Sequence, residues 1–102
     1  MMSRVMDTAE HETVRTEILE LCREAMPYGT NPNVLRAALR KNGYDLQERD
    51  LLTQIDYLKG KGLVETQEVQ NRRLDIHRLI VRLTPAGTDC LEGSGPDITG
   101  VG

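Results

Sequence analysis

The stretch YLKGKGLVE, residues 57–65, decides how this sequence folds, because a helix and an extended strand meet inside it. Leu58 lies on the apolar side of a helical pattern, and Gly60 and Gly62 then interrupt that pattern. Glycine adopts positive φ without strain, so Gly62 is suited to close the helix. An apolar pair at residues 63–64 begins the next segment, and the stretch therefore predicts a helix that passes directly into a strand.

Two extended runs follow, LVETQEVQ at residues 63–70 and LDIHRLIVRLT at residues 74–84, joined by NRR at residues 71–73. They predict an antiparallel hairpin whose second strand is long and rich in β-branched residues. Side chains alternate between the two faces of a strand. The face expected to meet the core carries His77, Leu79, Val81 and Leu83.

Helical patterns precede the hairpin. The first begins near Asp7 or Thr8, and its apolar residues recur at helical spacing: Val14, Ile18, Leu21 and Ala25, widened by Leu19, Cys22 and Met26. A second helix is predicted from a cap at Asn31 and a proline at Pro32 to a left-handed residue at Gly43. Its expected inner side consists of Val34, Leu35, Ala38 and Leu39.

The third helix is expected at about residues 46–60, with Asp45 and Glu48 as a capping pair. Its inward residues are Leu51, Leu52, Ile55 and Leu58. After the hairpin, LTPAGTDCLEG predicts a short fourth helix capped by Thr84 with Pro85 in its first turn. The sequence thus divides into residues 1–11, an N-terminal segment with the start of the first helix, a domain at residues 12–92, and a flexible glycine-containing tail at residues 93–102.

Composition limits the functional classes. The chain has 102 residues, 38% of them hydrophobic, which fits one small globular domain. The order of the predicted helices and strands gives this domain an α+β class with mainly helical content. The formal net charge of -3 is no polybasic footprint. No apolar run is long enough for a membrane span and the N-terminus lacks a signal-peptide pattern, so a soluble, cytoplasmic protein without a membrane partner is expected.

Neither catalysis nor a cofactor is expected. Cys22 and Cys90 belong to no metal-binding spacing and are interpreted as small apolar side chains. His11 and His77 have no nucleophile at a recognisable motif, and Gly60 and Gly62 end a helix instead of opening a phosphate loop. The sequence therefore predicts no enzyme, no metal and no cofactor.

The order helix, helix, helix, hairpin, short helix resembles that of winged helix-turn-helix domains. YLKGKGLVE is similar to the joint between recognition helix and wing in winged-helix repressors, and LTPAG resembles the Leu-Thr-x-x-Gly that follows their wing. More narrowly, RDLLTQIDYLKGKGLV and the Gly-Val near the end resemble small winged-helix proteins of Mu-like prophages. The resemblance covers about residues 12–92.

This resemblance implies a transcriptional regulator whose third helix enters the major groove of double-stranded DNA and whose wing reaches the adjacent backbone. Arg49 is a candidate for guanine, Gln54 for adenine, and Thr53 or Tyr57 for phosphate. The remaining candidates for DNA contact are Lys61, Arg72, Arg73 and Arg78. The acidic residues Glu48, Asp50 and Asp56 oppose this interpretation, and an ordinary solvated helix face with an Asp56–Lys59 ion pair explains the same pattern.

A second hypothesis is a protein-interaction module that binds no DNA directly, in a phage or a cellular setting. Leu74, Ile76 and Ile80 share one side of the predicted hairpin, where exposed apolar groups mark a homodimer or partner interface. The fourth helix or the tail is an alternative cover for these residues. The first helix is another candidate surface for a homodimer, which would place two third helices on paired half-sites. The fold alone does not choose between the hypotheses.

Overall fold

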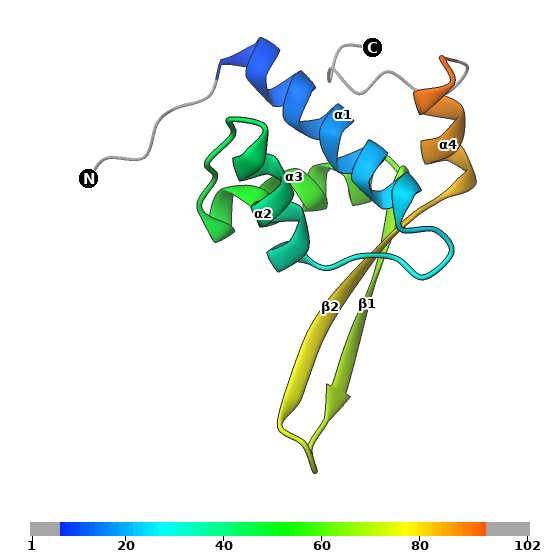
Figure 1. Ribbon diagram of the computed structural model, residues 1–102. Coiled ribbons are helices and arrows are strands. Elements are labelled where there is room, and N and C mark those ends of the chain that lie inside the picture. Colours follow the sequence, from blue (N-terminus) through cyan, green and yellow to red (C-terminus); the bar gives the residue numbers. More distant parts are fainter. Residues whose placement is uncertain (1–6, 94–102) are drawn as a thin grey trace.

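The computed structural model describes residues 7–93 and contains four helices and one hairpin. The elements in chain order are α1 (Thr8–Glu24), α2 (Pro32–Lys41), α3 (Glu48–Gly60), β1 (Val64–Asn71), β2 (Ile76–Leu83) and α4 (Pro85–Leu91). Figure 1 shows the helices gathered at one end, with the hairpin extending away from them as an arm. The predicted tail falls almost wholly on residues 94–102, which lie outside the described residues.

The starts of α2 and α4 and the end of α3 follow the residues that the sequence predicts for them. The Asn31 side chain accepts a hydrogen bond from the backbone N–H of Val34 at 3.0 Å, and Pro32 occupies the first turn of α2. The Thr84 hydroxyl likewise accepts from the backbone N–H of Gly87 at 3.0 Å at the start of α4. Gly62 has a φ of 75°, so the chain turns out of α3 as expected.

The start of α3 differs from the prediction. Its N-cap is Gln47, which makes no side-chain capping bond, so the expected pair of Asp45 and Glu48 is wrong. Asp45 instead accepts a hydrogen bond from Arg40 Nε at 3.3 Å. Leu46 is buried just before the helix.

The sheet is an antiparallel pair in which Val64 lies opposite Leu83 and Asn71 opposite Ile76. On the other side of β2, Thr30 forms an isolated bridge to Val81, with N–H···O distances of 2.9 and 2.8 Å. The turn occupies residues 72–75, one residue later at its start and two at its end than the predicted NRR. Val81 and Leu83 are buried, as expected for their face, whereas His77 near the tip is exposed.

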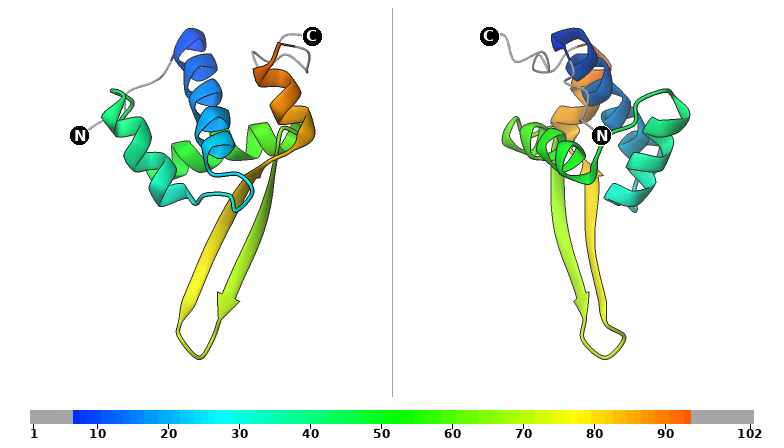
Figure 2. Two further views of the ribbon diagram at one scale, coloured as in Figure 1. Left: turned by 45° about the vertical axis from the view of Figure 1, so that its right-hand side comes forward. Right: turned by 90° about the vertical axis from the view of Figure 1, so that its left-hand side faces the viewer.

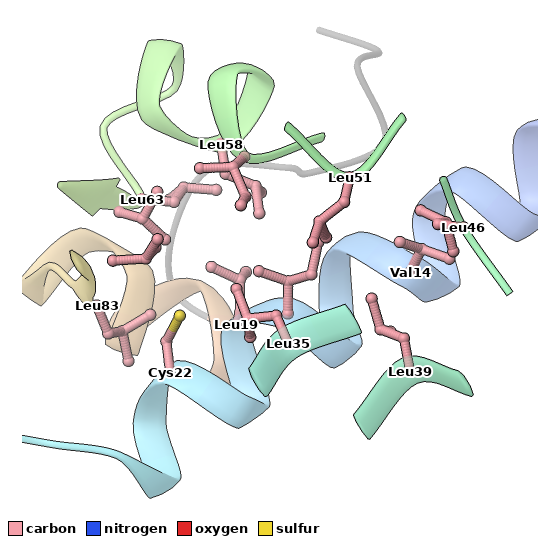
Figure 3. Packing of buried hydrophobic residues seen from close by; sticks show 14 residues of the cluster. Val14, Leu19, Cys22, Leu35, Leu39, Leu46, Leu51, Leu58, Leu63 and Leu83 are labelled. Atoms are coloured by element: carbon pink, nitrogen blue, oxygen red, sulfur yellow. The ribbon is translucent and has the colours of Figure 1, made fainter. Parts of the chain in front are cut away.

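One core joins α1, α2, α3 and the root of the hairpin (Figure 3). Its members are Val14, Ile18, Leu19, Cys22, Leu35, Leu39, Leu46, Leu51, Ile55, Leu58, Leu63, Val64, Val81 and Leu83. Two residues predicted for the inner faces lie elsewhere: Val34 is 54% exposed and Met26 is 49% exposed. Val34 belongs to the first turn of α2, where its side chain faces solvent, and Met26 lies past the end of α1.

This arrangement is a winged helix-turn-helix fold, with α2 and α3 as the helix pair and the β1–β2 hairpin as the wing. The predicted fold class, mainly helical α+β, is confirmed. Within residues 7–93, no helix has both the length and the apolar character that crossing a membrane requires.

Candidate nucleic-acid interface

The outer side of α3 is the surface that a winged helix presents to DNA. Arg49, Thr53 and Asp56 are exposed and follow one another at spacings of four and three residues, which places them on one line along the helix. The Thr53 hydroxyl donates to the backbone oxygen of Arg49 at 3.0 Å. Within residues 7–93, no salt bridge joins Asp56 to Lys59, so the predicted ion pair is absent.

Gln54 is not part of this outer surface. Its side chain is only 3% exposed. Its Oε1 accepts a hydrogen bond from Arg15 Nε at 2.9 Å, and its amide nitrogen lies 2.7 Å from His11 Nδ1. The expectation that Gln54 faces outward to read adenine is therefore wrong, because α1 packs over this side of α3 and binds the amide.

Tyr57 belongs to the same contact between α1 and α3. The Arg15 guanidinium stacks on its ring at 3.7 Å from the centroid, and Lys61 Nζ lies 5.6 Å from that centroid. The Tyr57 hydroxyl is buried and has no hydrogen-bond partner among the described residues. A phosphate cannot reach this hydroxyl in the structure, so of the two candidates for a phosphate contact only Thr53 is exposed. Lys61 is exposed as well.

The wing tip presents arginines on a well-defined turn. Asn71 Oδ1 accepts from the backbone N–H groups of Arg73 at 3.1 Å and Leu74 at 3.3 Å, and Asp75 closes the turn with a φ of 52°. Arg72, Arg73 and Arg78 are exposed. In the part of the chain that the structure describes, none of these three guanidinium groups forms a salt bridge.

A groove of about 570 Å³ separates the wing from the starts of α2 and α3. Glu48 and Leu52 line one wall, and Glu68 and His77 line the other. Glu68 Oε2 lies 3.9 Å from His77 Nε2, and both side chains are exposed. Glu68 was not among the residues predicted from the sequence, although strand alternation and the register place it on the same face as His77.

The three apolar residues predicted to form an interface have different surroundings. Leu74 is 67% exposed at the wing tip, and Ile76 is partly buried next to it. Ile80 packs against the loop after α1, because a Cβ built on Gly29 would lie 2.9 Å from Ile80 Cγ2. This loop, which was not among the expected covers, shields Ile80 and leaves Leu74 and Ile76 as the accessible pair.

Among the described residues, no group of three or more His, Cys, Asp or Glu side chains is placed to hold a metal ion. Figure 2 shows the wing extending well beyond the helices, as in winged-helix proteins with a long wing. Arg72 and Arg73 belong to the turn at its tip.

Comparisons with known proteins agree with this fold. No family model matches the sequence, and no curated protein matches it. A solved structure from Thermoplasma acidophilum, described as a candidate transcriptional regulator, is similar with a TM-score of 0.74 and 16% identity over 87% of this chain and 81% of that chain. A transcriptional regulator from Clostridium thermocellum is similar with a TM-score of 0.67 and 21% identity over 85% of this chain and 83% of that chain.

Proposed function

We propose that this chain is a DNA-binding transcriptional regulator that places α3 in the major groove and its wing on the adjacent backbone. The observation that carries the proposal is the wing tip, where Arg72 and Arg73 project from an ordered turn without an acidic partner in residues 7–93. Phosphate neutralisation by such side chains supplies most of the sequence-independent affinity for DNA. The two similar structures, both described as regulators, support the same role.

The contacts divide between the two elements. On α3, Arg49 and Thr53 are exposed on the outer line and face the bases. On the wing, Arg72, Arg73 and Arg78 bind phosphates on either side of a groove. Gln54 and Tyr57 support α3 from the α1 side and contact no DNA.

The test is fluorescence anisotropy of a labelled random-sequence duplex at about 50 mM and about 200 mM salt. The double variant Arg72→Ala/Arg73→Ala is compared with Arg23→Ala/Arg40→Ala, which removes two exposed arginines that pair with Glu20 and Asp45 far from the wing tip. We expect the wing variant to bind more weakly and to lower the slope of log affinity against log salt by about 2, whereas the control keeps the slope of the unaltered protein. Equal slopes for the two variants would contradict the role of the wing.

A protein-interaction module is the second candidate, and exposed apolar side chains favour it. Tyr28 is 81% exposed and Met26 is 49% exposed on the loop after α1. Tyrosine and methionine are enriched at the centres of protein interfaces. If the unaltered protein binds no duplex at about 50 mM salt, this candidate replaces the regulator.

A further inference from the structure

Asp56 raises a specific question about the outer line of α3. It is exposed in line with Arg49 and Thr53, and no salt bridge joins it to any residue within 7–93. A carboxylate on this line lowers the affinity for every duplex, because phosphates repel it. Such a residue favours binding only where a base offers it a hydrogen-bond donor.

The major groove contains such a donor. Cytosine presents its N4 amino group there, and Asp or Glu side chains accept from it. Asp56 is free to do so, since no helix-internal ion pair holds its carboxylate among the described residues. Asp50, by contrast, is partly buried and lies on the flank of α3 that faces α1, because its position differs from that of Gln54 by four residues.

The neighbours of Asp56 have equally defined chemistry. The Thr53 hydroxyl donates its proton to the Arg49 backbone oxygen at 3.0 Å, so its methyl group is the part suited to contact a base. A thymine methyl group is the apolar partner available in the major groove. The Arg49 guanidinium, which has no salt bridge within residues 7–93, matches the O6 and N7 acceptors of guanine.

We propose that Asp56 is a specificity-determining residue that selects cytosine, at the far end of a short site whose other end is a guanine bound by Arg49. This inference rests on the proposed DNA-binding function and specifies the bases of the site that the protein binds. Asp56 follows Arg49 by seven positions along the helix, a rise of about 10 Å, which spans about three base-pair steps. The site is a duplex with guanine and cytosine contacts at this spacing and an apolar contact from Thr53 between them.

The experiment is selection of bound duplexes from a randomised pool, followed by anisotropy on the selected site. Asp56→Asn keeps the side-chain size and removes the charge, and asparagine pairs with adenine through N6 and N7. We expect Asp56→Asn to exchange the cytosine preference for adenine and to weaken binding to the original site by about 5- to 150-fold. The matched control Asp50→Asn removes the same charge from the same helix and should retain the preference for cytosine in the selected site.

The outcomes separate this inference from the proposed function. Salt-sensitive binding with identical selected sites for the unaltered protein and Asp56→Asn overturns the role of Asp56 and leaves the regulator intact. An equal rise in affinity of both Asn variants for all sequences does the same, because it shows that only net charge matters. Absence of salt-sensitive binding by the unaltered protein overturns both. Circular dichroism of the two variants establishes that each is folded.

Discussion

Gly87, the last residue of LTPAG, shows how one missing side chain fixes the junction between wing and helices. A Cβ built on Gly87 would lie 2.2 Å from the backbone oxygen of Leu63 and 2.5 Å from Leu83 Cδ1. Only a residue without a side chain lets α4 approach the root of the hairpin this closely. The glycine is required here for space and not for an unusual φ.

Gly87→Ala is therefore expected to lower the free energy of unfolding by about 3 kcal/mol, the upper part of the range for overpacking. Gly60→Ala is expected to raise the free energy of unfolding instead, because nothing lies within 4 Å of a Cβ at that helical position. That substitution should stabilise the protein by up to about 1 kcal/mol. Urea unfolding of both variants measures the difference, and equal stabilities would contradict the close approach at Gly87.

Cys22 gives a pH-dependent prediction at the same scale. Burial raises the pKa of its thiol from 9.0 to about 11. The folded state thus favours the neutral thiol. The contribution of this thiol to the free energy of unfolding is therefore constant below pH 9, and it is lost as the pH rises from 9.0 to about 11. In a Cys90→Ala background, alkylation near pH 9 should be about 50-fold slower in water than in concentrated urea, because the thiolate is the nucleophile and a group with a pKa of about 11 is about 1% ionised at this pH, against about half for a pKa of 9.0. Equal rates, measured by mass spectrometry, would show that Cys22 is accessible.

At the scale of elements, the order of helices and strands could be predicted because caps and glycines act locally. Asn31, Thr84 and Gly62 perform in the structure the roles that their residue types suggest. Which flank of each helix is covered by a neighbouring helix could not be predicted in the same way. Gln54 is polar and yet buried, because burial depends on which neighbouring helix covers that flank. The exposed line of α3 was therefore only partly predictable from periodicity.

The groove between α3 and the wing leads to a prediction about Glu68. With α3 in the major groove and the wing tip on the adjacent minor groove, the DNA backbone between these two DNA grooves passes along the protein wall that Glu68 lines. Glu68→Gln removes a charge that repels phosphate, and we expect about 3- to 10-fold tighter binding to a random duplex at low salt. Glu65→Gln, on the opposite face of β1, is the control and should change affinity little. An equal gain from both substitutions, measured by anisotropy, would assign the effect to net charge alone.

At the scale of the whole molecule, the predicted homodimer requires a surface at which two copies pack. We propose a homodimer in which Leu74 and Ile76 of the two wings pack together, since Leu74 is 67% exposed and Ile76 lies beside it on the same hairpin. Isologous pairing of this kind would relate two copies of α3 by a two-fold axis and match two half-sites on the duplex.

Ile76→Glu is expected to convert such a dimer into a monomer, because a carboxylate would be buried without a partner at the centre of the contact. Gln70→Glu adds the same charge one position away along the hairpin ladder but on the opposite face, since Gln70 lies opposite His77, and it should leave the dimer intact. Sedimentation velocity over a range of concentrations distinguishes the two variants. A dimer that survives Ile76→Glu would move the contact to another surface, and an unaltered protein that stays monomeric at every concentration would remove the dimer altogether. If the dimer survives Ile76→Glu, the spacing of the two half-sites must follow from that other surface. If the protein is always a monomer, a single copy of α3 must read a single site.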